Sequence, residues 1–384
     1  MYRLILFILP LFCLCCGQNG GNISSEKDSE LQFQKVSDTL FFNDGAKRHP
    51  YWYDHTTNLL IFRNMTDSVF EYYDLQTNKF VKTFRVDPKY WEFVASPTDI
   101  FVQFSGSEVM FLYDSLYNYR GDLIIWDLEK AEVKRKFPIA FDEETDYIFI
   151  RLNKGFQPYF DYKNQKIYTE ALNYENYEGR KHKLDTEILV EYDMQTGEKK
   201  MVPFKFPDIM SQITICGFQH AVYSCVRGDS MIISYSEVPN IDIYDVSDSM
   251  LYRHSVPHEH YDTLAGNSPD IQTNFDMCRQ GWLTEFFFGP IKYNPAQDLF
   301  YRTYRDKMPL MKADSTYNTE QDKPFGIQVL DPDFNILGDF PIADIPRWEE
   351  LFEFFPTKDG LLYSRIPGEG NDTVVLHYLN FKYE

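Results

Sequence analysis

The sequence predicts an all-β protein whose strands form a six-bladed β-propeller, and three observations lead to this fold class. Aromatic side chains, which favour half-buried strands, are abundant: the 384 residues include 33 Phe, 28 Tyr and 5 Trp. The stretch EYYDLQTNKFVKTF at residues 71–84 returns as EYDMQTGEKKMVPF at residues 191–204. Two further strand-like runs stand upstream of such copies, so each unit carries four short strands. Repeated four-stranded units predict a β-propeller.

Each repeated unit has an Asp at the end of one strand, followed by turn residues and a second strand. Asp accepts hydrogen bonds from the backbone of the next residues, so it favours the reversal of a hairpin. The markers are Asp74, Asp127, Asp193, Asp245 and Asp331, and Asn380 takes this place in a degenerate sixth unit. The count gives six blades. Seven blades are an alternative, which requires one more unit within the long interval between Asp245 and Asp331.

The two ends of the repeated region complement each other. The last unit lacks a fourth strand, while an additional strand-like run, LQFQKVSDTLFF at residues 31–42, precedes the first unit. We therefore expect the N-terminal strand to complete the last blade, which closes the ring and leaves no open seam. This places the segment around Phe33 beside the blade that contains Val375.

The N-terminus has the features of a secretory signal. A single cation, Arg3, precedes an apolar run that is about half the roughly 20 residues of a membrane-spanning helix. The three cysteines that end the run resemble a bacterial lipoprotein signal, which implies lipidation of Cys16, with Cys15 as the alternative. An ordinary signal peptide is the competing interpretation. The expected organisation is a signal at 1–15, a flexible tether at 16–30 and one propeller domain at 31–384.

The lipoprotein signal, the strand that enters the last blade and the Asp-marked hairpins together resemble a Bacteroidetes family of propeller lipoproteins of unknown function, similar to TolB-like six-bladed propellers. The resemblance covers nearly the whole mature chain. It implies a location in the cell envelope, anchored to the outer membrane and facing either the periplasm or the cell surface. It implies no reaction.

Net charge and cysteine usage restrict the partners and the chemistry. The formal net charge of -20 disfavours nucleic acid as a partner, because phosphate backbones repel an acidic surface. Cys216 and Cys225 flank a turn between two short strands, so a cross-strand disulfide is conceivable, with buried free thiols as the alternative. Neither a nucleotide-binding nor a G-x-S-x-G motif occurs, and we expect no cofactor.

Aromatic and basic residues lie near the expected starts of the innermost strands, including a second-blade strand expected to begin near Tyr90 and Trp91. Flat rings and cationic groups of this kind hold sugars, peptides or carboxylates. The candidates for such a binding rim are His49, Tyr51, Trp91, Tyr159, His220, Arg347 and Trp348. The alternative is that these side chains only pack the ends of the blades.

A histidine-rich segment, HSVPHEH, is the sharpest local cluster. His254, His258 and His260 could bind zinc or copper if the backbone turned them inward, but the flanking polar residues favour a solvated loop, and we expect no metal. The preferred function is a membrane-tethered, non-enzymatic propeller that binds a protein, peptide or glycan. The alternatives are a periplasmic hydrolase or lyase acting on a carbohydrate or lactone, and a purely structural envelope component.

Overall fold

The computed structural model describes most of the propeller region. The described residues are 31–42, 46–55, 57–95, 102–105, 107–115, 120–140, 148–151, 155–173, 177–178, 181–182, 187–209, 222–262, 275–319, 322–342, 354–365 and 373–383. The signal and the tether expected at 1–30 lie outside them, as do Cys216, His220, Arg347 and Trp348.

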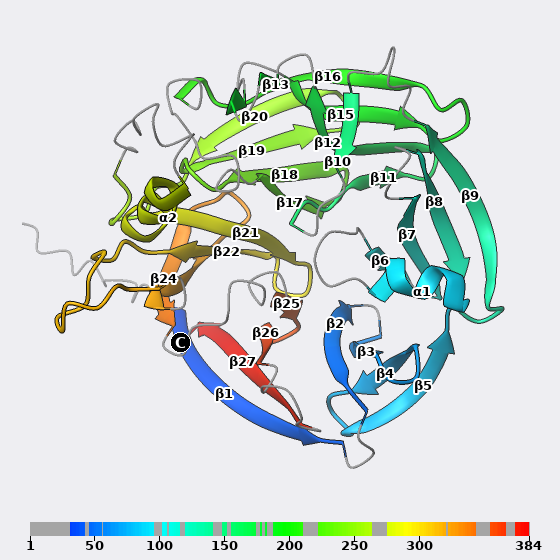
Figure 1. Cartoon of the computed structure of the whole chain (residues 1–384), viewed down its shortest axis with the longest axis horizontal. Coiled ribbons are helices and arrows are strands. Elements are labelled where there is room, and N and C mark those ends of the chain that lie inside the picture. Colours follow the sequence, from blue (N-terminus) through cyan, green and yellow to red (C-terminus); the bar gives the residue numbers. More distant parts are fainter. Residues whose placement is uncertain are drawn as a thin grey trace, which may run out of the picture.

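Six small antiparallel sheets are arranged as blades around a central axis (Figure 1). Blade 1 contains β2 (Arg48–Asp54), β3 (Leu59–Asn64), β4 (Val69–Asp74) and β5 (Lys79–Arg85). Blade 2 contains β6 (Val102–Ser105), β7 (Glu108–Ser115), β8 (Arg120–Asp127) and β9 (Glu132–Ala140). In blade 3, β10 (Ile148–Arg151) and β11 (Tyr159–Asp161) both pair with β12 (Lys166–Asn173), which is followed by β15 (Glu187–Asp193) and β16 (Lys199–Lys205).

The second half of the ring repeats this order. Blade 4 contains β17 (Val222–Arg227), β18 (Ser230–Tyr235), β19 (Asn240–Asp245) and β20 (Met250–Ser255). Blade 5 contains β21 (Phe287–Asn294), β22 (Leu299–Arg305), β23 (Phe325–Leu330) and β24 (Ile336–Ile342). Blade 6 contains β25 (Phe354–Thr357), β26 (Gly360–Arg365), β27 (Thr373–Tyr383) and β1 (Leu31–Phe41), and a separate two-stranded sheet joins β13 (Tyr177–Glu178) to β14 (Lys181–His182).

The two ends of the propeller close the ring as predicted. Strand β1 pairs with β27 over its whole length, from Leu31 opposite Tyr383 to Phe41 opposite Thr373. The six-bladed architecture is therefore confirmed, and the alternative of seven blades is wrong. The described part of the interval between Asp245 and Asp331 holds the last strand of blade 4, a helix, long connections and the first three strands of blade 5 instead of an additional blade.

The marker Asp residues build the turns that the sequence predicted. The carboxylate of Asp74 accepts hydrogen bonds from the backbone N–H of Gln76 at 2.8 Å and of Thr77 at 3.4 Å. The same arrangement follows Asp127, Asp193, Asp245 and Asp331. These bonds satisfy backbone donors that the hairpin leaves unpaired, which is why Asp recurs at this position.

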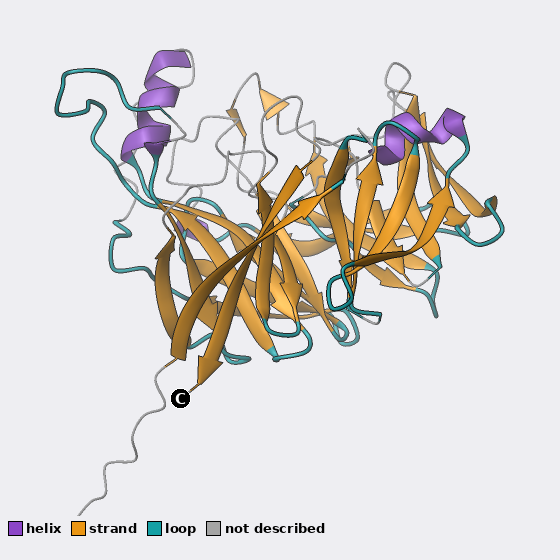
Figure 2. Ribbon diagram, turned by 90° about the horizontal axis from the view of Figure 1, so that it is seen from below, coloured by secondary structure: helices purple, strands orange, loops and turns teal. Residues whose placement is uncertain are grey.

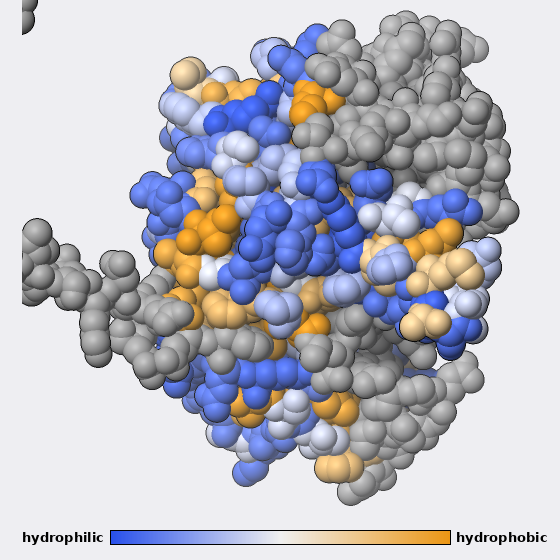
Figure 3. Space-filling view, turned by 90° about the vertical axis from the view of Figure 1, so that its left-hand side faces the viewer, coloured by the Kyte–Doolittle hydropathy of each residue, from blue (hydrophilic) through white to orange (hydrophobic). Residues whose placement is uncertain are grey.

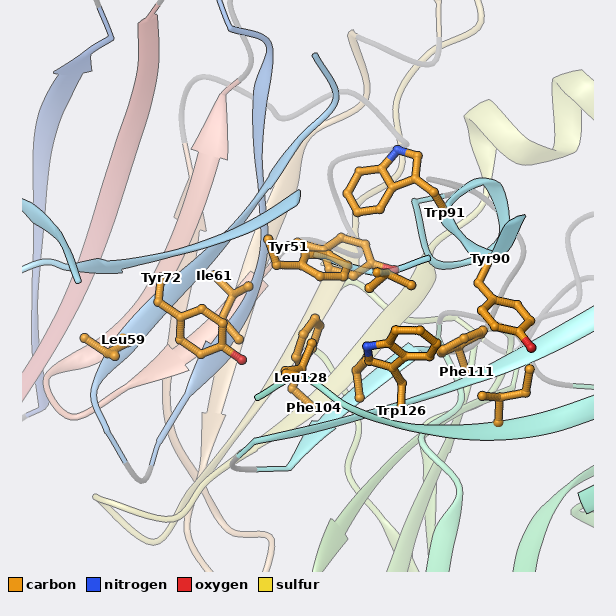
Figure 4. Close-up of a cluster of buried hydrophobic side chains, with 14 residues drawn as sticks. Tyr51, Leu59, Ile61, Tyr72, Tyr90, Trp91, Phe104, Phe111, Trp126 and Leu128 are labelled. Carbon is orange, nitrogen blue, oxygen red and sulfur yellow. The ribbon is translucent and has the colours of Figure 1, made fainter. Parts of the chain in front are cut away.

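The core consists of separate hydrophobic clusters, one at each of the six interfaces between neighbouring blades. The cluster between blades 1 and 2 is shown in Figure 4. At the closing interface, Leu40, Leu362 and Leu376 of blade 6 pack against Leu60 and Phe62 of blade 1. Because every blade buries both faces in this way, ring closure removes the last exposed face from water.

Two short helices interrupt the strands in the described part of the chain, and one of them corrects an expectation. Tyr90 and Trp91 belong to helix α1 (Pro88–Ala95) and do not begin a strand. Asp87 caps this helix by accepting a hydrogen bond from the N–H of Lys89 at 3.0 Å, and Pro88 occupies the first helical position. Helix α2 (Phe275–Thr284) is the other. Among the described residues, no helix is long and apolar enough to cross a membrane.

The two faces of the ring differ in the length of their connections (Figure 2). Within each blade, the first and third turns are short and lie on one face, here called the short-turn face. The connections between blades, together with the loop between the second and third strands of each blade, lie on the other face, here called the long-loop face. Helices α1 and α2 lie on the long-loop face, whereas Leu31 and Tyr383 lie at the short-turn face.

Candidate functional site: the long-loop face

Two of the predicted binding residues lie in the core instead of on a rim. Tyr51 is 7% exposed and Trp91 is 8% exposed, and both belong to the cluster between blades 1 and 2 (Figure 4). The ring of Tyr51 stacks on Phe70 at 5.8 Å, and the guanidinium of Arg63 lies over it at 5.1 Å. These contacts use the faces of the Tyr51 ring for packing.

The other two predicted residues that are described, His49 and Tyr159, lie on different blades. His49 is half-buried on β2. Tyr159 on β11 donates its hydroxyl to Asp229 at 2.9 Å, and Asp229 lies in a turn on the short-turn face. Burial raises the pKa of Tyr159 to about 12, with a further contribution from this hydrogen bond. His220, Arg347 and Trp348 lie outside the described residues, so a shared rim stays a prediction.

The predicted histidine cluster divides between separate contacts. His254 lies on β20 with its ring 5.2 Å from that of Phe334, whereas His258 and His260 follow β20 on the long-loop face. Within the ranges given above, no group of three or more His, Cys, Asp or Glu side chains could hold a metal ion.

His258 and Tyr304, which are both buried, form a network with the exposed carboxylate of Asp339. Its Nε2 lies 2.9 Å from one carboxylate oxygen of Asp339, and the hydroxyl of Tyr304 donates to the other at 2.5 Å. The Nδ1 of His258 accepts the backbone N–H of His260 at 3.0 Å, which leaves Nε2 to donate to Asp339. Burial raises the pKa of Tyr304, and its hydrogen bond to Asp339 raises it further, so the phenol stays protonated.

His260 forms a second, more accessible pair. Its Nδ1 lies 2.5 Å from the carboxylate of Asp306, and its side chain is 52% exposed. The hydrogen bond to Asp306 raises the pKa of His260 above its usual value. The Nε2 of the same ring lies 3.4 Å from a carboxylate oxygen of Glu259, which is exposed. An exposed imidazole that a carboxylate orients through Nδ1 can transfer protons. Nearby, Lys307 forms an ion pair with Asp262.

Two fully buried cations fix the connections above blades 4 and 5. Arg302 donates to the backbone carbonyls of Val238, Pro239 and Val256 at 3.0–3.2 Å, and it lies 3.5 Å above the ring of Phe288. Burial lowers the pKa of the Arg302 guanidinium well below its usual value. Because carbonyl oxygens of blade 4 accept from a side chain of blade 5, Arg302 joins the two blades.

Lys323 is the second buried cation, and it binds the C-terminal end of helix α2. Its ammonium donates to the carbonyls of Trp282 and Glu285 at the end of the helix and lies over the rings of Trp282 and Phe287. Cations at a helix C-terminus are favourable because the last carbonyls are unpaired. The sequence analysis singled out neither cation. The aromatic run LFYRTYR was a visible signal for Arg302, whereas Lys323 had no such signal.

The loop between β22 and β23 projects from the long-loop face as an ordered hairpin, residues 309–318 (Figure 2). Lys312 donates its N–H to the carbonyl of Thr316 at 2.7 Å, and Asp314 accepts the N–H of Thr316 at 3.0 Å. At the hairpin, Met311 and Tyr317 form a bridge and are 47% and 66% exposed. A preformed hairpin that exposes Tyr and Met has the composition of a protein-binding surface.

The carboxyl groups give little support for acid catalysis. Within the part of the chain that is described, every resolved pKa shift of an Asp or Glu is downward. The largest lowers the pKa of Asp322 to about 2 through hydrogen bonds from Lys312 and Thr319. A carboxylate held ionised in this way cannot donate a proton near neutral pH.

Cys225 is a buried thiol on β17, and no disulfide joins it to another described residue. Burial raises its pKa to about 12, so it is unreactive as a nucleophile at neutral pH. The partner expected for it, Cys216, lies outside the described residues, and their pairing stays a prediction.

Comparisons with known proteins agree with this fold. The crystal structure of a member of the DUF4221 family from Bacteroides vulgatus is similar, with a TM-score of 0.67 and 14% identity over 93% of this chain and all of that chain. A putative exported protein from Bacteroides fragilis has a TM-score of 0.49 and 9% identity over 91% of this chain and 95% of its own. No curated protein matches. The model of the domain of unknown function DUF4221 matches residues 22–339, and the chain therefore belongs to this family.

Proposed function

We propose that this protein is an extracytoplasmic lipoprotein that holds its propeller at a membrane and binds a protein, peptide or glycan through the long-loop face. The observation that carries the proposal is the distribution of chain segments between the two faces. The propeller begins at Leu31 on the short-turn face, whereas α1, α2 and the hairpin at 309–318 project from the opposite face. A tether that leaves from the short-turn face directs the variable loops away from the membrane.

The length of the proposed tether supports a close attachment. If Cys16 carries the lipid, or Cys15 in the alternative, residues up to 30 form a Gly- and Ser-containing linker with a root-mean-square span of about 20 Å. The short-turn face then stays near the lipid surface. Labelling with a radioactive fatty acid tests the anchor: the Cys16→Ser variant should lose the label, whereas retention by Cys16→Ser and loss by Cys15→Ser would assign the lipid to Cys15.

Site-specific photocrosslinking in cells tests the binding face. A photoreactive amino acid replaces Tyr317, which is 66% exposed on the long-loop face, or Tyr162, which is 51% exposed in a turn on the short-turn face. We expect a discrete adduct from position 317 and none from position 162. Adducts from position 162 alone would contradict binding through the long-loop face.

One observation favours a second candidate function, a periplasmic hydrolase or lyase acting on a carbohydrate or lactone. The pair of His260 and Asp306 could accept a proton from water or from a sugar carbon, because Asp306 orients an imidazole whose side chain is 52% exposed. The test compares the wild type with His260→Gln on polysaccharides and lactones, with product release as the readout. A product that the wild type releases and the variant does not would favour the enzyme over the binding protein.

A further inference from the structure

The basic residues of this acidic protein are concentrated on three neighbouring outer strands. Strands β5, β9 and β16 carry nine of the chain's 38 Lys and Arg, and the only acidic residue among them is Glu132. We call these residues the basic belt; they are Lys79, Lys82 and Arg85, Lys134, Arg135 and Lys136, and Lys199, Lys200 and Lys205. With a net charge of -20 for the whole chain, this is a marked local reversal of sign.

The three strands form a continuous part of the outer rim. They are the outermost strands of blades 1, 2 and 3, which follow one another around half of the ring (Figure 1). All members of the basic belt are exposed except Lys82 and Lys199, which are half-buried. The belt therefore presents its charges outward along a curved surface.

Only part of this charge is neutralised by the protein itself. Lys134 pairs with Glu108 and Lys136 pairs with Asp122. By contrast, no ion pair joins Lys79, Arg85 or Arg135 to a carboxylate of the described residues. Unpaired cations on a rim are available to an external anion.

Protection of sheet edges does not account for the belt. Lysines on an outer strand do prevent strands of other molecules from pairing with it. However, the outer strands of blades 4, 5 and 6 are equally exposed edges, and they carry one Arg, no cation and one Lys respectively. On the side formed by blades 5 and 6, hydrophobic and hydrophilic patches alternate (Figure 3). Edge protection would apply to all six blades, whereas the belt covers only three.

We propose that the basic belt binds an acidic polysaccharide, whose carboxylate groups lie along the rim of blades 1 to 3. Guanidinium and ammonium groups pair with carboxylates, and Arg does so with two parallel hydrogen bonds. A flexible sugar chain can follow the curvature of the rim. A flat membrane meets only a narrow strip of a curved surface, and duplex DNA, with a persistence length of about 500 Å, is too stiff to bend around it.

This binding site is separate from the long-loop face and does not depend on the function proposed for that face. The test measures binding of the propeller to a polygalacturonate oligosaccharide by titration calorimetry, at low salt and at about 0.2 M salt. Neutral dextran, phosphatidylglycerol vesicles and a short DNA duplex serve as comparison probes. We expect binding to polygalacturonate that weakens with salt and no binding to dextran.

Two triple variants with the same change in net charge locate the site. Lys79→Gln, Arg135→Gln and Lys200→Gln remove one exposed cation from each strand of the belt, and none of these side chains forms a hydrogen bond or an ion pair within the described residues. The control combines substitution by Gln of three exposed lysines outside the belt, at positions 47, 358 and 382. Each exposed contact contributes a factor of about two, so the belt variant should bind roughly eightfold more weakly and the control should bind like the wild type.

Three results would overturn the proposal. The first is the absence of measurable binding of polygalacturonate by the wild type at low salt. The second is an equal loss in both triple variants, which would reflect net charge and not the belt. The third is tighter binding to the vesicles or to the DNA than to the polysaccharide. Circular dichroism and thermal unfolding confirm that both variants keep the fold.

Discussion

The closure of the ring can be tested with a disulfide across the seam between β1 and β27. Thr39 lies directly opposite Val375, and neither side chain is buried. Directly paired residues of antiparallel strands have Cα atoms about 4.5–5.5 Å apart, within the range that a disulfide spans. The double variant Thr39→Cys and Val375→Cys should therefore form an intramolecular bond under mild oxidation.

The expected stabilisation follows from the length of chain that the bond encloses. The loop contains roughly 340 residues, and the chain-entropy relation assigns it about 6 kcal/mol, of which about 2–4 kcal/mol is usually realised. For a protein of this size, that gain corresponds to a rise of about 3–5 °C in the midpoint of thermal unfolding. The assay compares oxidised and reduced protein by calorimetry, and peptide mapping by mass spectrometry identifies the bond.

A control with a shifted register makes the test specific. Val36 is three residues from Thr39 on the same strand, so its Cα lies roughly 10 Å from the position opposite Val375. The pair Val36→Cys and Val375→Cys should stay reduced. A bond in this control, or the failure of the Thr39 pair to oxidise, would refute both the register and the closure.

Three further predictions concern single residues. Gly360→Ala should destabilise the protein by more than about 3 kcal/mol in urea unfolding, because a Cβ there meets a backbone oxygen at 2.0 Å, whereas Gly228→Ala should cost only about 1 kcal/mol. Arg302→Gln should cost about 2–4 kcal/mol by the same measurement, since it leaves buried carbonyls without their donor. The raised pKa of His260 means that its stabilising charge is fully present below about pH 6.5 and lost as the pH rises through its folded pKa. The wild type should therefore lose thermal stability over that range, and His260→Gln should lose less.

The fold was predictable because its signals are local and repeated. An Asp such as Asp193 forms its turn with the two or three residues that follow it, so the turn is visible in any short window of sequence. The closure could be inferred as well. The last unit lacks its fourth strand and the N-terminus has one additional strand, so pairing these two ends completes every blade. Helix α1 was not predicted, because its eight residues are too few to show the 3.6-residue periodicity of an amphipathic helix.

The contacts of the long-loop face could not be predicted for a different reason. His258 meets Asp339 and Tyr304 only because the ring brings the end of blade 4 beside the outer strand of blade 5. Nothing in the sequence around His258 indicates these partners. The burial of Tyr51 and Trp91 could not be predicted either. An aromatic residue near the expected start of a strand is compatible with an exposed rim and with an interface between blades.

The pairing of β1 with β27 also constrains the timing of folding. The first strand of the propeller finds its partner only after the last strand has been synthesised, and at about 5–20 residues per second this takes roughly 20–70 seconds. Until then, the blades at both ends keep an unfinished edge or an uncovered face. The nascent protein therefore stays in an open form until β27 has emerged from the ribosome, because only then can β1 pair with it.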